Sequence, residues 1–119
     1  MTTAFELTGR KALVTGAANG IGAAIAAALA RAGAAVTLTD VAEEQGSATA
    51  ASIGGHFARL DVTEESDWDA AIATAVRMMG GLDIVVNNAG IEVSALAIDA
   101  DPRDLRRMLD VNVVGTALG

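Results

Sequence analysis

Cysteine and tyrosine are absent from this sequence, and histidine and lysine each occur once. Without cysteine the chain has no disulfide frame, no thiol nucleophile and no thiolate ligand for a metal. The single histidine, His56, cannot build a multi-histidine zinc site. No tyrosyl acid or base exists, and Lys11 is the only lysine that could act in catalysis. We therefore expect no metal site.

Positive charge is also scarce, because 8 Lys and Arg residues stand against 15 Asp and Glu residues, a formal net charge of −7. Nucleic acids and anionic membranes bind clustered cations, so we expect neither as a partner. The most apolar stretch, residues 20–39, is rich in alanine and contains Arg31, which makes it a poor membrane span. The first ten residues lack the basic start and the apolar core of a signal peptide. A cytoplasmic location is the expectation.

The 119 residues are enough for a single domain, residues 1–119, in which short apolar runs alternate with stretches of helical periodicity. The sequence predicts strands at residues 11–15, 35–39, 57–62 and 82–86. It predicts helices at residues 21–32, 42–53 and 68–79, and a last helix that begins near Pro102. Such alternation is typical of parallel βαβ units with right-handed crossovers. We expect an α/β fold, a Rossmann-type doubly wound parallel sheet of about four strands in the order 3-2-1-4.

Within the third predicted helix, Trp68, Ile72, Val76 and Met79 recur at helical spacing. This spacing predicts that the four side chains form the buried face of the helix.

The fourth predicted strand is as apolar as an interior strand, yet the sequence contains no later strand to cover its outer side. An uncovered apolar edge promotes aggregation, and natural proteins usually avoid one. We therefore expect the chain to be the front part of a longer protein. The alternative is a small protein that dimerises through this edge.

A glycine-rich turn, G-x-x-x-G-x-G, joins the first predicted strand to the first predicted helix. Gly16 allows a tight turn, Gly20 lets a diphosphate approach the backbone, and Gly22 lets the helix pack close to the sheet. The N–H groups at a helix start carry a partial charge of about +0.5, which attracts an anion. The turn therefore predicts a dinucleotide site, and a purely structural turn is the alternative.

The turn and three later motifs together resemble the N-terminal half of a short-chain dehydrogenase/reductase. The resemblance covers essentially all 119 residues. In chain order the motifs are the cofactor turn Thr15-Gly16-x-x-x-Gly20-Ile21-Gly22, the adenine-contacting pair Asp61-Val62, the NNAG motif Asn87-Asn88-Ala89-Gly90, and Asp110-Val111-Asn112, where the family has the asparagine of its catalytic tetrad.

The resemblance implies a set of cofactor-binding residues at the turn and at the tips of the strands. They are Gly16, Asn19, Gly20, Ile21, Gly22, Asp40, Asp61, Val62, Asn88, Ala89 and Gly90. It also implies that the Asp61 side chain and the Val62 backbone hold the adenine. Of the two asparagines in the NNAG motif, Asn87 is expected to tie neighbouring strands and Asn88 to touch the cofactor.

Asp40 ends the second predicted strand and indicates which dinucleotide is bound. A carboxylate there accepts hydrogen bonds from both hydroxyls of the adenosine ribose and repels a 2′-phosphate. Two charges 5 Å apart at an effective dielectric near 20 interact by about 3 kcal/mol. At Asn19, family members that use NADP often carry a basic residue, which also favours NAD. The alternative is that Asp40 only caps the following helix.

In the family, the asparagine at the position of Asn112 bends its helix and positions a water for proton transfer. The alternative is a structural amide. The family's serine and its Tyr-x-x-x-Lys pair lie C-terminal to this point, so the chain by itself is expected to be inactive. The whole protein is expected to be a homo-oligomeric enzyme that transfers hydride between NAD and a small alcohol or carbonyl substrate.

Two other functions remain open at this point. One is a non-catalytic NAD-binding sensor or assembly module, which the sequence after Gly119 would distinguish from an enzyme. The other is epimerisation or dehydration, although those larger relatives usually space their glycines G-x-x-G-x-x-G, unlike this chain.

Overall fold

The computed structural model describes residues 6–89, in which strands and helices alternate regularly. In chain order the elements are β1 (Lys11–Thr15), α1 (Gly20–Arg31), β2 (Ala35–Asp40), α2 (Glu43–Ser52), β3 (His56–Arg59), α3 (Glu65–Met79) and β4 (Ile84–Val86). The strands pair in parallel in the order β3-β2-β1-β4, which confirms the predicted topology. Gly90, Asn112 and the helix expected near Pro102 lie outside the described residues.

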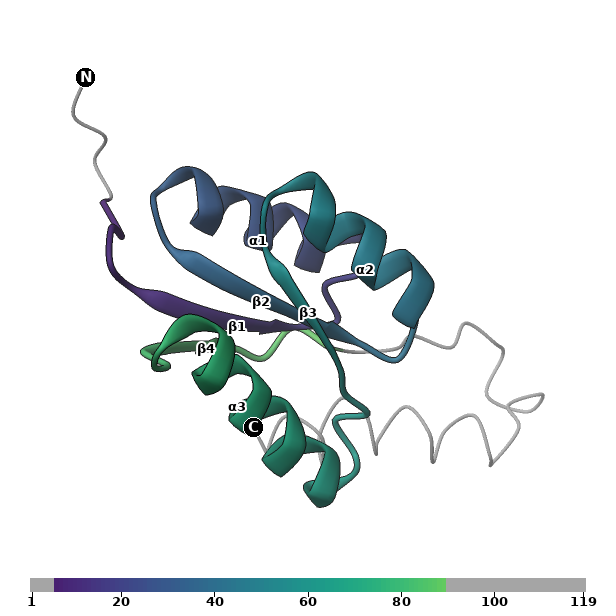
Figure 1. Ribbon diagram of the computed structural model, residues 1–119. Helices are drawn as coiled ribbons and strands as arrows, with labels where there is room; N and C mark the ends of the chain where they lie inside the picture. Colours follow the sequence, from purple (N-terminus) through teal and green to yellow (C-terminus); the bar gives the residue numbers. More distant parts are fainter. Residues whose placement is uncertain (1–5, 90–119) are drawn as a thin grey trace, which may run out of the picture.

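The described helices cover both faces of the sheet, α1 and α2 on one face and α3 on the other (Figure 1). The chain moves outward from β1 to β3 and then returns to place β4 on the other side of β1. With right-handed crossovers, this reversal puts α3 on the face opposite α1 and α2. All carboxyl ends of the strands therefore meet at one edge of the sheet, next to the point where the strand order reverses.

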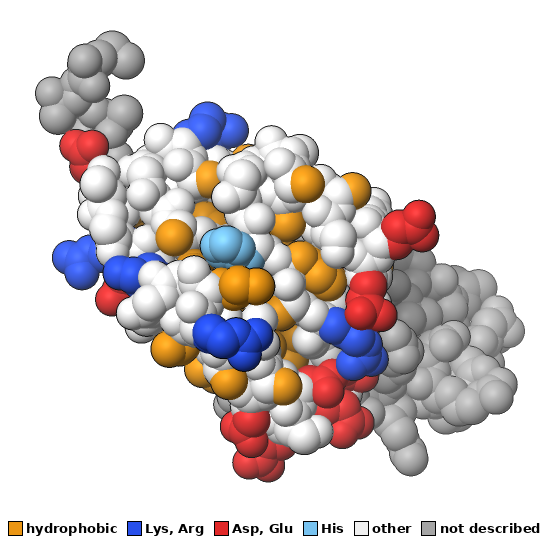
Figure 2. Space-filling view, in the orientation of Figure 1, with side chains coloured by type: hydrophobic (Ala, Val, Ile, Leu, Met, Phe, Trp, Pro, Cys, Tyr) orange, Lys and Arg blue, Asp and Glu red, His pale blue; other side chains and the backbone are white. Residues whose placement is uncertain are grey.

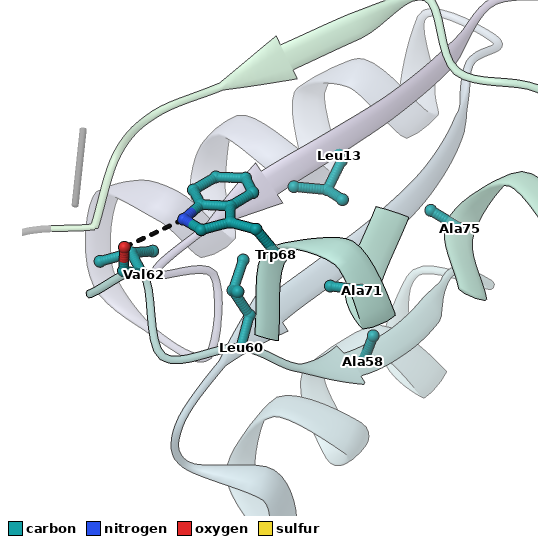
Figure 3. Close-up of a cluster of buried hydrophobic side chains, with 7 residues drawn as sticks. All are labelled: Leu13, Ala58, Leu60, Val62, Trp68, Ala71 and Ala75. Atoms are coloured by element: carbon teal, nitrogen blue, oxygen red, sulfur yellow. Dashed lines mark hydrogen bonds between the residues drawn. The ribbon is translucent and has the colours of Figure 1, made fainter. Parts of the chain in front are cut away.

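Each face of the sheet has its own hydrophobic core. The cluster under α1 and α2 consists of Val14, Ala17, Ala26, Ala34, Val36, Leu38 and Ala50. The cluster under α3 consists of Leu13, Ala58, Leu60, Val62, Trp68, Ala71 and Ala75 (Figure 3). Leu13 and Val14 are both completely buried and point to opposite faces, so β1 is the centre of the fold.

The predicted buried face of α3 is half wrong. Trp68 is 3% exposed, as expected, but Ile72 is 37% exposed and Val76 is 42% exposed. Ala71 and Ala75 are buried in their place. The stripe 68-71-75 has the same helical spacing as the predicted one, and its small side chains let the helix lie closer to the sheet.

Two strands are shorter than predicted. β3 ends at Arg59, although the Leu60 N–H still donates to the Asp40 carbonyl at 3.2 Å. β4 begins at Ile84, because the Asp83 side chain replaces the ladder just before it. The Asp83 carboxylate accepts from the Lys11 N–H at 2.9 Å, and the Asp83 N–H donates to the Lys11 carbonyl at 2.8 Å.

Thr37 in β2 carries the one buried side-chain polar atom without a hydrogen-bond partner among residues 6–89, its Oγ1. Replacing it with valine keeps the branched shape and removes an unsatisfied hydroxyl. We expect Thr37→Val to raise the free energy of unfolding by about 1 kcal/mol, as measured by urea denaturation.

Thr39, two residues along the same strand and equally buried, is the matched control. Its Oγ1 donates to the Val14 carbonyl at 3.0 Å, so Thr39→Val removes a satisfied bond and is expected to destabilise the protein. The same direction of change in both variants would contradict this explanation.

Candidate functional site

The glycine loop between β1 and α1 requires its glycines for different reasons. Gly16 and Gly20 have φ values of +63° and +61°, which favour glycine. A Cβ on Gly22 would lie 2.1 Å from the Gly16 carbonyl oxygen. A Cβ on Gly20 would meet no atom within 4 Å. The backbone at Gly20 is therefore open to a ligand, whereas Gly22 is closed by packing.

No acidic side chain in the first turn of α1 neutralises the positive end of the helix dipole. The N-cap residue, Asn19, makes no side-chain hydrogen bond to the helix. The Asn19 amide instead donates to Gln45 Oε1 on α2 at 3.2 Å. Ile21, the next residue after Gly20, is 74% exposed. The positive end of the helix dipole therefore faces outward beside an exposed apolar side chain.

Asp40 lies beside this loop and braces it. One carboxylate oxygen accepts from the Ala18 N–H at 3.1 Å, and the other accepts from the Ala42 N–H at 3.0 Å. The Ala18 carbonyl in turn accepts from the Thr49 hydroxyl at 2.7 Å. Ala42 is the N-cap residue of α2. Asp40 thus contacts both the start of α2, as the capping alternative expects, and the glycine loop, and its binding to a ribose stays a prediction.

Thr15, at the end of β1, holds the segment that follows β4. Its Oγ1 accepts from the N–H groups of Asn88 at 2.9 Å and Ala89 at 3.0 Å. The Asn88 side-chain amide donates to the Gly16 carbonyl at 3.3 Å. Asn88 thus ties the segments together, which the sequence had suggested for Asn87. The sequence predicted no separate role for Thr15. A threonine next to the first glycine of the turn was a usable signal, because its hydroxyl can bind backbone groups there.

Replacing Thr15 with valine removes an acceptor from two backbone N–H groups at once. Thr15 is only 1% exposed, so water reaches these groups poorly. We expect Thr15→Val to lower the free energy of unfolding by about 2 kcal/mol, as measured by urea denaturation. Thr15→Ser keeps the oxygen and should lose much less. A loss in Thr15→Ser as large as in Thr15→Val would contradict this explanation, because serine keeps the acceptor oxygen and removes only the methyl group.

Asp61 and Val62 follow β3 at the same edge of the sheet. Asp61 Oδ1 accepts from the N–H of Thr63 at 3.0 Å and from its hydroxyl at 2.6 Å, which makes a tight turn. Val62 is 6% exposed and packs into the core under α3. The turn thus lies at the carboxyl edge of the sheet, with the Val62 side chain in the core.

The rest of the described surface adds few candidate sites. Among residues 6–89, there is no group of three or more His, Cys, Asp or Glu side chains that could hold a metal. No helix in the same part of the chain is long and apolar enough to cross a membrane. On the face shown in Figure 2, Lys and Arg side chains are scattered among acidic and uncharged ones.

Comparisons with known proteins agree with this geometry. The family model for short chain dehydrogenases matches residues 10–119. The 3-alpha-(or 20-beta)-hydroxysteroid dehydrogenase of Mycobacterium tuberculosis is 42% identical over 116 residues, which cover 96% of this chain and 45% of the relative. Trans-4-hydroxycyclohexanecarboxylate dehydrogenase of Sinomonas cyclohexanicum is 40% identical in an alignment 119 residues long. The alignment covers 91% of this chain and 46% of the relative. The chain therefore spans less than half the length of these relatives.

Solved structures show the same fold. A 3-ketoacyl-(acyl-carrier-protein) reductase from Brucella melitensis, complexed with NADH, matches with a TM-score of 0.90 and 35% identity. The match covers 95% of this chain and 48% of that one. A short-chain type dehydrogenase/reductase from Mycobacterium marinum matches with a TM-score of 0.88 and 35% identity over 96% of this chain and 48% of its own. With a family match across almost the whole sequence and this agreement in structure, the chain belongs to the short-chain dehydrogenase/reductase family.

Proposed function

We propose that this chain is the cofactor-binding part of an NAD-dependent oxidoreductase that interconverts a small alcohol and its carbonyl compound. The observation that carries the proposal is the contact between Asp40 and the glycine loop, in which a carboxylate oxygen lies 3.1 Å from the Ala18 nitrogen. This contact supports the proposal because it brings an acid at the tip of β2, the position expected to bind the ribose, beside the glycine turn that is expected to bind the diphosphate.

The described residues fit a dinucleotide. Gly20 leaves open space above the backbone, and the adjacent N-terminus of α1 has no acidic side chain in its first turn. These features suit a diphosphate, which brings negative charge and needs backbone donors. Exposed Ile21 offers an apolar contact beside it. When bound, NAD would supply the hydride acceptor, and the residues of this chain would hold and orient it.

The proposed binding set keeps the expectations from the sequence. The glycine loop takes the diphosphate, Asp40 takes the adenosine ribose, and Asp61 and Val62 take the adenine. Asn88 and Ala89 shape the floor under the cofactor through their bonds to Thr15 and Gly16. Gly90 and the catalytic role of Asn112 belong to the proposal by family resemblance, since both residues lie outside the described part.

Catalysis requires residues that this chain does not contain. The family's proton donor is a tyrosine, and the sequence has none. We propose that the 119 residues alone are inactive and that the whole protein is a cytoplasmic homo-oligomer. A non-catalytic NAD-binding module is the second candidate, and the lack of tyrosine in residues 1–119 does not distinguish it from the enzyme. A reading frame that continues to a Tyr-x-x-x-Lys supports the enzyme, and one that stops at Gly119 supports the module.

Calorimetric titration of the full-length protein with NAD and with NADP tests NAD binding, which both candidates require. We expect NAD to bind about a hundredfold more tightly, the ratio that the charge of Asp40 predicts. Tighter binding of NADP, or no binding of either dinucleotide, would overturn the assignment.

A further inference from the structure

The first turn of α3 holds Asp61 and Val62, which lie in the segment after β3. The Asp61 N–H donates to Asp67 Oδ2 at 2.9 Å, and the indole Nε1–H of Trp68 donates to the Val62 carbonyl at 2.9 Å. Figure 3 shows the indole pointing from α3 toward Val62, with the bond dashed. Two consecutive helix residues thus bind two consecutive residues of the strand tip.

These bonds are more than incidental surface contacts. Trp68 is 3% exposed, and its bond to Val62 is buried, so the indole N–H would lose its partner if the segment moved. The same Asp67 oxygen also accepts from Arg59 Nη1 at 2.8 Å. The Arg59 side chain is 47% exposed, so its ion pair with Asp67 contributes little stability. The main effect of Asp67 is therefore to hold the Asp61 N–H, and with it the peptide group of Asp61, in place.

Neither bond uses the two groups that the resemblance implies for adenine, the Asp61 carboxylate, whose Oδ1 also accepts from Thr63, and the Val62 N–H. Trp68 takes the Val62 carbonyl, so the Val62 N–H is the backbone group that we expect to meet the base. The Asp61 carboxylate is the expected partner of the amino group at C6. Adenine offers a donor at that amino group and an acceptor at N1, which match a carboxylate and an N–H. Hypoxanthine offers the reverse pattern and mismatches both.

We propose that Asp67 and Trp68 are positioning residues for base selection, which hold Asp61 and Val62 in the register that distinguishes adenine from hypoxanthine. This inference rests on the proposed dinucleotide site. Neither residue touches the cofactor in this account. Each acts by fixing one peptide group of the pair that does.

The test compares NAD with nicotinamide hypoxanthine dinucleotide, which differs only in the base. Dissociation constants for both are measured by titration of the purified protein and its variants. Trp68→Phe keeps an aromatic ring and removes the N–H, and Asp67→Ala removes the carboxylate. We expect each variant to reduce the preference for NAD by a factor of about five. Asp67→Asn keeps an acceptor oxygen and should retain most of the preference.

Ala75→Gly is the matched control. Ala75 is completely buried in α3 but has no hydrogen bond to Asp61 or Val62, and glycine weakens the helix. A general loss of stability reduces the fraction of folded protein for both dinucleotides equally, so the control should keep the wild-type preference.

The outcomes separate this inference from the proposed function. A wild-type protein that binds neither dinucleotide overturns the proposed function and the inference with it. A wild-type protein that prefers NAD, with the same preference in Trp68→Phe and Asp67→Ala, overturns only the inference. A loss of preference in Ala75→Gly as large as in Trp68→Phe also overturns it, because stability would then explain the effect.

Discussion

Dinucleotide binding is expected to fall about a hundredfold in a Gly22→Ala protein, because overpacking of about 3 kcal/mol must be relieved by moving the loop. The added Cβ would lie 2.1 Å from the Gly16 carbonyl oxygen and 2.6 Å from the Asn88 amide nitrogen. The first of these is backbone and cannot rotate away. Relief therefore requires α1 to move from the sheet or Gly16 to shift, and both movements displace the proposed diphosphate site. Calorimetric titration with NAD measures the loss.

Gly81→Ala provides the control for the same chemical change. A Cβ at Gly81 would lie 3.4 Å from Cδ of Lys11, an ordinary contact with a flexible side chain. We expect this variant to bind NAD like the wild type. Wild-type affinity in Gly22→Ala would mean that the junction of the glycine loop with α1 is not part of the binding site.

The sequence predicted the topology because the signals were local and repeated. Strand-like runs alternated regularly with stretches of helical periodicity, and this alternation led directly to the prediction of parallel pairing. The predicted strands were also nearly all apolar, as expected when helices cover both sides of a sheet. The buried face of α3 was a different matter. The periodicity predicted that the large apolar residues face inward. A second set of residues, which includes Ala71 and Ala75, has the same helical spacing, and that set is the buried one. Ile72 and Val76 could not be placed by period alone.

The candidate site divides in a similar way. The strand order predicted that the glycine loop, Asp40 and the tip of β4 would share an edge, and the hydrogen bonds of residues 6–89 join all of them. The different roles of Asn87 and Asn88 depend on which side chain reaches Gly16, and the sequence alone does not show that it is Asn88. The role of Thr15 depends on a contact across 73 positions of sequence, to Asn88, so the local signal beside the first glycine does not name its partner.

Asp40→Ala is expected to reduce the preference for NAD over NADP by up to about a hundredfold. Alanine removes the carboxylate that would bind the ribose hydroxyls and repel a 2′-phosphate. It also removes the acceptor for the Ala18 N–H, so a loosened glycine loop should lower the affinity for both dinucleotides by a common factor, on which the gain of NADP from the lost repulsion is superimposed. Titration of this variant with both cofactors therefore measures two effects. The ratio of the two dissociation constants reports the lost charge, and their absolute values report the loosened loop.

Asp40→Asn separates these two effects. The amide has no charge, so the preference should narrow nearly as far as in Asp40→Ala. Its remaining oxygen can still accept from one of the two N–H groups that the carboxylate now binds, Ala18 or Ala42, so binding of NADP should be tighter than in the alanine variant. Asp69→Ala removes the same charge from an exposed position on α3 and should leave the ratio unchanged. If Asp40 only braces the loop, both affinities fall by the same factor and the ratio stays constant, which would remove the physical basis for choosing NAD.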